Sequence, residues 1–300
     1  MKHVYSRREF TLMTVAGAFA ARRIFGEPDK SSEPLVRFGF VTDLHFADIN
    51  PFKGRGPSSR YFRESAHKLD EAVALFNERK VDFAIELGDL KDKTRGHDDT
   101  LAQLEKIETS FARFNGPRYH VAGNHDFDCI TPEEFFSRTP NDGIVTKTGW
   151  YSFERGGVKF IVLNACFTSK MEQYDRSNPW TDSNIPPEEI DWFKKELSAA
   201  KRHVVVFCHQ RLDDSAERHH LVKNAKAVRE IIERSGKVRA VITGHQHSGG
   251  KCMWKGVPYY TLRAMVCDTG KEANSFAEGA IYPSGAFTVT GWRNASSWEQ

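Results

Sequence analysis

The sequence predicts an α/β fold in which layered sheets are covered by helices. Three observations predict it: short apolar strands recur along the chain, helical segments lie between the early strands, and hairpin-like strands follow late. Several strands are apolar almost throughout, which is typical of strands covered on both faces. No repeat and no Gly/Ser/Pro-rich linker divides the chain after residue 35, so we expect one domain over residues 35–293.

The expected strands share a high content of β-branched and aromatic residues. They cover residues 36–42, 81–87, 119–122, 158–163, 204–208, 238–243, 257–262 and 286–290. Helices are expected where apolar residues recur on one face of a 3.6-residue period. These segments are residues 59–79, 100–114 and 223–234, and a further helix opens at Pro186 and Pro187 with acidic residues in its first turn.

The overall composition is that of a folded protein with little net charge. Hydrophobic residues make up 39% of the chain, enough for a sizeable core, and 43 basic residues against 40 acidic ones give a net charge of +3. This balance argues against nucleic acid as the partner. The five cysteines form no CxxC pair, so we expect free or buried thiols instead of a zinc ribbon or a disulfide framework.

The first 25 residues resemble a twin-arginine export signal. Arg7 and Arg8 precede an apolar stretch over residues 12–21, and the small residues Ala18 and Ala20 suit a cleavage site. The stretch is too short for an ordinary transmembrane helix, so we expect no stable membrane span in the mature protein. We therefore expect an exported, periplasmic or otherwise extracytoplasmic protein. Its oligomeric state is not predicted.

Polar clusters follow five of the predicted strands directly. They are Asp43-Leu44-His45, Gly88-Asp89, Gly123-Asn124-His125-Asp126, His209 and Gly244-His245-Gln246-His247. Each cluster alone would be an ordinary turn. Because α/β folds gather their ligands at the carboxyl ends of strands, we expect the five to meet at one edge.

The residue types in these clusters suit divalent cations. In an extended segment, positions i and i+2 point to the same side, so Asp43 with His45 and His245 with His247 can each face one site. A carboxylate such as Asp89 has two oxygens and can bridge two cations. The set therefore predicts two divalent ions that share a carboxylate and leave positions open for water or phosphate. We interpret Asp92 as a helix-cap acid, with support of the site as the alternative.

The ordered set resembles the calcineurin-like metallophosphoesterase superfamily, whose pattern is D-x-H, G-D-x-x-[DN], G-N-H-[DE], a lone His and G-H-x-H. The resemblance covers residues 36–262. It implies a four-layer α/β/β/α sandwich, the metallo-dependent phosphatase fold, with two mixed sheets flanked by helices. It also implies two ions of manganese, iron or zinc. The first would be held by Asp43, His45, Asp89 and His247, and the second by Asp89, Asn124, His209 and His245.

A finer resemblance is to the manganese-dependent ADP-ribose/CDP-alcohol diphosphatase group. Residues 43–48, 60–65, 244–250 and 258–262 are similar to segments of that group. This chain departs from it at His45, Lys251 and Arg263, where members carry Gln, Tyr and Glu. The resemblance implies a small phosphorylated substrate of the nucleotide-diphosphate type, such as ADP-ribose.

We expect a hydroxide that bridges the two ions to attack phosphorus. His125, oriented by Asp126, would protonate or stabilise the leaving oxygen. Candidate substrate contacts lie beside the motifs; they are Arg60, Arg63 and Arg211. Alternatively, these three arginines belong to a solvated basic surface that does not contact the substrate. His219 and His220 are expected in a loop before the helix at residue 223.

Other functions remain alternatives at this point. A cyclic-nucleotide phosphodiesterase or a phosphomonoesterase of the acid or alkaline phosphatase kind would use the same two ions. A non-catalytic metal-binding domain is disfavoured because all seven ligand positions and His125 are present. A nuclease is disfavoured by the nearly neutral charge and by the lack of a stripe that combines aromatic and basic residues.

The export signal can be tested by replacing Arg7 and Arg8 with lysine, which keeps the charge and removes the arginine pair. The variant should accumulate in the cytoplasm, as measured by fractionation and immunoblotting. Unchanged export of the double variant would refute the signal.

Overall fold

The computed structural model describes residues 32–175, 178–270 and 272–299. The predicted export segment, residues 1–25, lies outside these ranges. Among the described residues, no helix combines the length and the apolar character needed to cross a membrane.

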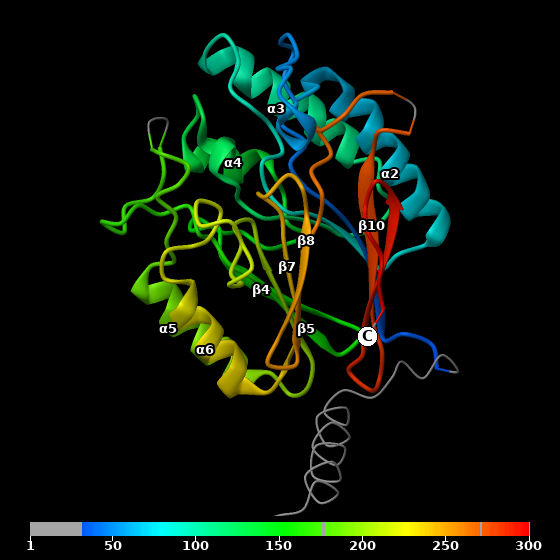
Figure 1. Ribbon diagram of the computed structural model, residues 1–300, viewed down its shortest axis with the longest axis vertical. Helices are drawn as coiled ribbons and strands as arrows, with labels where there is room; N and C mark the ends of the chain where they lie inside the picture. The colour runs from blue at the N-terminus through cyan, green and yellow to red at the C-terminus, as the bar shows by residue number, and fades with distance from the viewer. Residues whose placement is uncertain (1–31, 176–177, 271, 300) are drawn as a thin grey trace, which may run out of the picture.

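Two six-stranded mixed sheets form the centre of the protein (Figure 1). The first has the order β12-β11-β10-β1-β2-β3, and the second has the order β4-β5-β6-β7-β9-β8. The strands of the first sheet are β1 (Val36–Val41), β2 (Phe83–Glu86), β3 (Arg118–His120), β10 (Ser275–Ile281), β11 (Phe287–Arg293) and β12 (Trp298–Glu299). Those of the second are β4 (Tyr151–Arg155), β5 (Val158–Val162), β6 (Val204–Cys208), β7 (Val238–Thr243), β8 (Gly250–Trp254) and β9 (Val257–Thr261).

Helices cover the outer face of each sheet. The first sheet is covered by α2 (Ser65–Arg79), α3 (His97–Phe111) and α4 (Pro132–Arg138), whose apolar residues form one cluster with β1 and β2. The second is covered by α5 (Pro187–Ala199) and α6 (Ala225–Ser235), which pack on β5, β6 and β7. Short 3₁₀ turns lie at Gly56–Ser58, Phe62–Glu64 and Asn124–Phe127. This arrangement confirms the expected four-layer α/β/β/α sandwich.

The facing sides of the two sheets are joined by a core of aromatic rings. Phe83 on β2 stacks on Phe38 at 5.2 Å between ring centroids and meets Phe160 of the opposite sheet edge-to-face at 4.8 Å. Phe160 in turn stacks on Phe207 at 5.9 Å. All four side chains are fully buried, so the sheets are held at a fixed separation by rigid groups.

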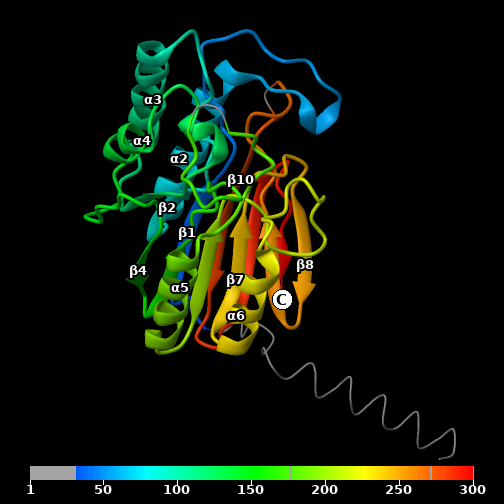
Figure 2. The same ribbon diagram turned by 90° about the vertical axis from the view of Figure 1, so that its left-hand side faces the viewer.

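The parallel strands of both sheets bring their carboxyl ends to one edge. In the first sheet β1 pairs in parallel with β2, and β2 with β3. In the second, β5, β6, β7 and β9 are parallel. Figure 2 shows the arrow of β7 pointing towards the edge where the long loops gather. The five polar clusters all follow strands that end at this edge.

All eight predicted strands are present, with small differences at their ends. Four further strands, β4, β8, β10 and β12, and the short helix α4 were not predicted. β10 is central in its sheet, but its sequence places Glu278 and Gly279 in the middle, which weakens the strand pattern. Glu278 is accommodated because its Oε2 accepts from Arg79 Nε at 2.9 Å. The helix expected from residue 59 begins at Ser65, after two short turns.

Replacing Phe83 with alanine should lower the free energy of unfolding by about 3–5 kcal/mol, because the ring fills the space between the sheets. Chemical denaturation measures the change. Phe52→Ala is the matched control: the Phe52 side chain is 58% exposed, and its removal should cost less than about 0.5 kcal/mol. Equal losses in the two variants would contradict the assignment of the core.

Candidate metal centre

The loops that follow β1, β2, β3, β6 and β7 bring their Asp and His side chains into one buried cluster. Donor atoms of three groups lie within 4.8 Å of one another. These groups are Asp43 with His45 and His247, His45 with Asp89 and His125, and Asp89 with His209 and His245. Asn124 precedes His125 in the same turn. The seven predicted ligands of the two ions and the predicted catalytic residue His125 therefore meet at the edge where the strands end.

Asp89 is central to this cluster. Its Oδ2 lies 3.4 Å from Nε2 of His45 and 3.2 Å from Nε2 of His209. Its Oδ1 accepts from the backbone N–H of His125 at 2.8 Å. Asp43 divides its oxygens in the same way, because Oδ2 accepts from the N–H of His245 while Oδ1 lies 3.4 Å from His247 Nε2. Each carboxylate thus keeps one oxygen facing the imidazoles.

Hydrogen bonds to Nδ1 orient three of the imidazoles. Nδ1 of His45 lies 3.1 Å from Asp92 Oδ2, Nδ1 of His209 lies 2.8 Å from the carbonyl of Leu87, and Nδ1 of His247 lies 3.2 Å from the carbonyl of Pro57. A carbonyl or carboxylate at Nδ1 fixes the proton there. Nε2 of each ring therefore faces the cluster and becomes a cation ligand once it carries no proton.

Four buried polar atoms of the cluster have no hydrogen-bond partner among the described residues. They are Asp43 Oδ1, Asn124 Oδ1, His209 Nε2 and His245 Nε2. Buried polar atoms in native proteins are nearly always satisfied, so four exceptions in one place call for a missing partner. A carboxylate oxygen, an amide oxygen and two imidazole nitrogens are cation ligands. The residues present therefore fit a pair of divalent cations.

The backbone of the cluster is held in an unusual conformation. Asp43, His45, Asp89 and His245 have φ angles of 51°, 45°, 60° and 66°, in the left-handed region that side chains other than glycine seldom adopt. Such conformations persist only where the surrounding structure imposes them, and they concentrate at functional sites.

Two motif glycines let the loops approach closely. A Cβ on Gly88, whose φ is 101°, would lie 2.5 Å from Nδ1 of His209. A Cβ on Gly244 would lie 1.9 Å from Oγ1 of Thr42. Neither position has room for a side chain, because the backbone itself packs against the residues of the cluster.

The electrostatics of the cluster favour charged carboxylates. Burial alone would raise the pKa of Asp43, but the nearby imidazoles of His247 and His45 hold it well below its usual range. Burial acts on Asp89 in the same way, and the charge of His209 holds its pKa well below the ordinary value. Burial lowers the pKa of His245 well below its ordinary value. Ionised carboxylates and a neutral His245 are protonation states that bind cations. Burial alone would lower the pKa of His209, but the charge of Asp89 raises it to about 9, so a cation would have to displace a proton from this ring.

The structure corrects the role expected for Asp126. The carboxylate of Asp126 accepts from the backbone N–H groups of Gly123 at 2.8 Å and of Asp89 and Leu90 at 2.9 Å each. It therefore ties the loop after β2 to the loop after β3. The ring of His125 is held instead by Asp128, whose Oδ2 lies 2.7 Å from Nδ1. This role was not predicted for Asp128, although its carboxylate, three residues after His125, is close enough in the sequence to suggest it.

Asp92 was expected as a helix cap, and this expectation was wrong. Helix α3 begins at His97, and its N-cap is Gly96. Asp92 is buried beside the cluster, where Oδ2 contacts His45 Nδ1 and accepts from Nη1 of Arg60 at 3.0 Å. Asp92 thus orients His45, and Arg60 neutralises Asp92.

The other two arginines considered for substrate contacts have partners within the protein. Arg63 is half-exposed and pairs with Asp48. Arg211 is buried, pairs with Asp213 through two nitrogens, and donates from Nη1 to Oε1 of Gln246 at 2.7 Å. Its contacts hold the turn that carries His245 and His247. A contact between substrate and Arg60, Arg63 or Arg211 stays a prediction.

An aromatic side chain that the sequence did not single out lies beside the cluster. The ring of Trp180 is 5.5 Å from that of His245 and 5.4 Å from that of His220, and the residue is 40% exposed. His220 itself lies 5.1 Å from His245. His219 and His220 also approach Glu217 closely enough to form a more exposed group of three donors. The loop expected before helix α6 therefore borders the cluster.

Known proteins with similar sequences include manganese-dependent ADP-ribose/CDP-alcohol diphosphatases. The protein from Oryza sativa subsp. japonica is 28% identical over 294 residues, which cover 84% of this chain and 90% of the rice protein. The protein from Arabidopsis thaliana is 26% identical over 279 residues, or 79% of this chain and 89% of that protein.

Solved structures show the same architecture. A dimetal phosphatase from Danio rerio superimposes with a TM-score of 0.77 at 20% identity, covering 89% of this chain and 98% of that one. A purple acid phosphatase from yellow lupin seeds superimposes with a TM-score of 0.60 at 12% identity, covering 89% of this chain and 54% of that one. Both likenesses concern the fold.

The family model for calcineurin-like phosphoesterases matches residues 36–249. That range holds every residue predicted for the two ions, together with His125. The chain is thus a metal-dependent phosphoesterase and belongs to the calcineurin-like phosphoesterase family.

Proposed function

We propose that this phosphoesterase hydrolyses the anhydride of a nucleotide-diphosphate-type substrate, such as ADP-ribose, at two divalent cations. The observation that carries the proposal is the position of Asp89. One buried oxygen lies 3.4 Å from His45 Nε2 and 3.2 Å from His209 Nε2. An oxygen placed between two groups of donors suits a pair of cations that share it.

We assign four residues to each cation. The first cation would be held by Asp43, His45, Asp89 and His247, and the second by Asp89, Asn124, His209 and His245. The unsatisfied atoms on Asp43, Asn124, His209 and His245 support this assignment. Mixed nitrogen and oxygen donors suit manganese, iron or zinc. Manganese is favoured because the rice and Arabidopsis relatives depend on it.

Bound at these residues, the two cations would supply a hydroxide at neutral pH and neutralise charge on the phosphate oxygens. His125 is suited to stabilise or protonate the leaving oxygen. Its ring lies 4.9 Å from that of His45, at the margin of the cluster, and its Nδ1 is fixed on Asp128 at 2.7 Å. The side chain is 21% exposed, whereas His45 is fully buried. His125 is therefore accessible to substrate.

Two observations support a nucleotide as part of the substrate. The exposed ring of Trp180 lies against His245, so it offers a stacking surface beside the second cation. The rice and Arabidopsis relatives act on ADP-ribose and CDP-alcohols, and they match this chain over most of both lengths.

The substrate class can be tested with three compounds and added manganese. ADP-ribose should be hydrolysed with a kcat/KM at least about tenfold above those of cyclic AMP and p-nitrophenyl phosphate. A preference for cyclic AMP would assign the protein as a cyclic-nucleotide phosphodiesterase. A preference for p-nitrophenyl phosphate would assign it as a phosphomonoesterase.

Replacing Asp89 with alanine should abolish activity, by about a thousandfold or more, and remove bound metal at the same time. Metal analysis of the purified variant and a hydrolysis assay measure the two effects. Asp98→Ala, which truncates a fully exposed acid, is the control and should change neither. An active Asp89→Ala variant would break the assignment.

Asp126 and Asp128 should respond differently to replacement by asparagine. Asp128→Asn should lower kcat by about tenfold to a hundredfold with little loss of stability, because an amide accepts more weakly from Nδ1–H of His125 and can instead donate to Nδ1, which favours the other tautomer. Asp126→Asn should lower the free energy of unfolding by about 2–3 kcal/mol, because an amide nitrogen would face backbone N–H groups. Steady-state kinetics and denaturation distinguish them. A loss of kcat in Asp126→Asn together with a loss of stability in Asp128→Asn would instead identify Asp126 as the partner of His125.

A further inference from the structure

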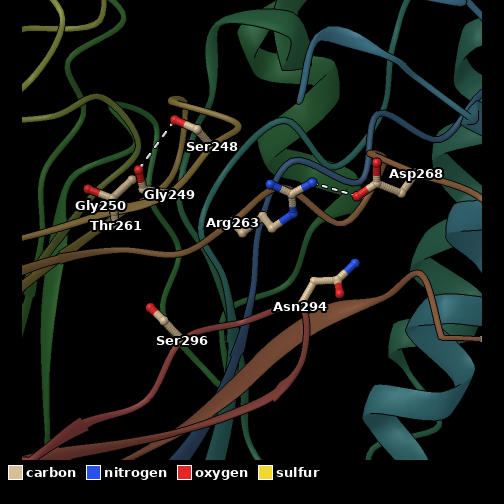
Figure 3. A pocket seen from close by; sticks show the side chains of 8 residues that line it. All are labelled: Ser248, Gly249, Gly250, Thr261, Arg263, Asp268, Asn294 and Ser296. Carbon is tan, nitrogen blue, oxygen red and sulfur yellow. Dashed lines mark hydrogen bonds and ion pairs between the residues drawn. The ribbon is translucent and has the colours of Figure 1, made fainter. Parts of the chain in front are cut away.

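A polar cavity of about 360 Å³ is lined from Ser248 onward, directly after His247 of the candidate metal centre. Figure 3 shows Arg263 near its middle, with Asp268 and Asn294 beside it. Its lining includes the polar side chains of Ser248, Thr261, Arg263, Asp268, Asn294 and Ser296. The proposed chemistry of the centre uses none of these side chains.

The topology places this cavity at the same edge as the metal centre. Strand β8 begins there at Gly250, β9 ends there at Thr261, and β11 ends at Arg293, just before Asn294. The segment that follows β9 is joined to the centre by backbone hydrogen bonds. The N–H of Ala264 donates to the carbonyl of His247 at 3.1 Å, and the N–H of Val266 donates to that of Asp43 at 3.0 Å.

The cavity and Trp180 are linked to different donor groups of the centre. Trp180 contacts His245, which we assign to the second cation. The cavity begins at Ser248, directly after His247, which we assign to the first cation. A substrate whose phosphates lie at the cations would therefore have one end at Trp180 and the other at the cavity.

The cavity offers both donors and acceptors. Nη2 of Arg263 pairs with Oδ2 of Asp268 at 2.5 Å. For the part of the chain that the structure describes, no hydrogen bond occupies the other two guanidinium nitrogens, the second Asp268 oxygen, or the side chains of Asn294 and Ser296. Figure 3 shows the Arg263–Asp268 pair. Arg263 supplies donors, Asp268 an acceptor, and Asn294 both.

This mixture selects a class of ligand. A second phosphate would gain from Arg263 but would meet the negative charge of Asp268. An apolar group would leave the donors and acceptors unpaired. Sugar hydroxyls each donate and accept a hydrogen bond, so neighbouring hydroxyls match an Arg–Asp pair flanked by an amide.

We propose that this cavity binds the distal sugar or polyol of the substrate, the hydroxyl-bearing group attached to the second phosphate. The inference rests on the proposed function, because it places the diphosphate at the two cations. A volume of about 360 Å³ accommodates a ribose.

CDP-glycerol and CDP-choline provide a matched test, since they share the nucleotide and differ in the distal alcohol. Glycerol carries two free hydroxyls there, and choline carries none. Arg263→Ala and Asn294→Ala should each lower kcat/KM for CDP-glycerol by about tenfold to a hundredfold. Neither variant should lower kcat/KM for CDP-choline, and Arg263→Ala should raise it slightly, because Asp268 would then face the choline cation without its partner.

Arg113→Ala is the control variant. Arg113 also forms an exposed pair with an aspartate, Asp70 at 3.0 Å, but it follows helix α3 and lies away from the strand ends that carry the centre. Arg113→Ala should leave kcat/KM unchanged for both CDP-glycerol and CDP-choline. Equal losses for CDP-glycerol and CDP-choline, or no loss for either, in the Arg263 and Asn294 variants would overturn the proposal.

Binding measurements separate this inference from the proposed function. If the unmodified enzyme hydrolyses ADP-ribose, CDP-glycerol and CDP-choline no faster than cyclic AMP and p-nitrophenyl phosphate, the proposed function fails. Calorimetry with ribose 5-phosphate and inorganic phosphate then decides the role of the cavity. Ribose 5-phosphate should bind at least about tenfold more tightly than phosphate, and Asn294→Ala should remove that advantage. Equal affinities for the two ligands in the unmodified protein would overturn the role of the cavity.

Discussion

The centre depends on the way in which the two oxygens of Asp89 are divided. One oxygen accepts from the backbone of His125, and the other faces His45 and His209. Because the first oxygen is fixed by the main chain, the second cannot rotate away from the imidazoles. The loops after β1, β2, β3 and β6, from both sheets, must therefore hold their positions for one carboxylate to serve two groups of donors.

Several features of the fold hold these loops in place. The parallel strands end at one edge, and the ring contacts of Phe83 and Phe160 fix the separation of the sheets. Asp126 joins the loops after β2 and β3 through backbone N–H groups. Left-handed backbone at Asp43 and Asp89 is tolerated because so many contacts surround it.

The architecture and the donor set could be predicted because both are encoded locally. A lone histidine after a buried strand, such as His209, is ordinarily a loop residue, but five strands each followed directly by Asp, Asn or His predict a shared site. Helix α6, which covers β6 and β7, could likewise be predicted from the 3.6-residue period of its apolar residues. In both cases the residues that determine the feature are neighbours in sequence.

The supporting contacts depend on residues that are distant in sequence. Asp126 and Asp128 stand two positions apart in one turn, and their roles differ because backbone donors from the neighbouring loop reach Asp126. Asp92 contacts His45, which lies 47 residues away in the sequence, and does not cap a helix. β10 is buried despite Glu278, since Arg79 neutralises it from helix α2. Such pairings follow from tertiary packing.

The donors of the centre come from both halves of the sandwich. The first sheet supplies Asp43, His45, Asp89 and Asn124, and the second supplies His209, His245 and His247. Cations held between them would act as cross-links from one half to the other, and the folded state would gain stability with the concentration of free metal. The lifetime of the protein against proteolysis would then follow the supply of metal in its surroundings, so scarcity would reduce both the activity and the amount of enzyme.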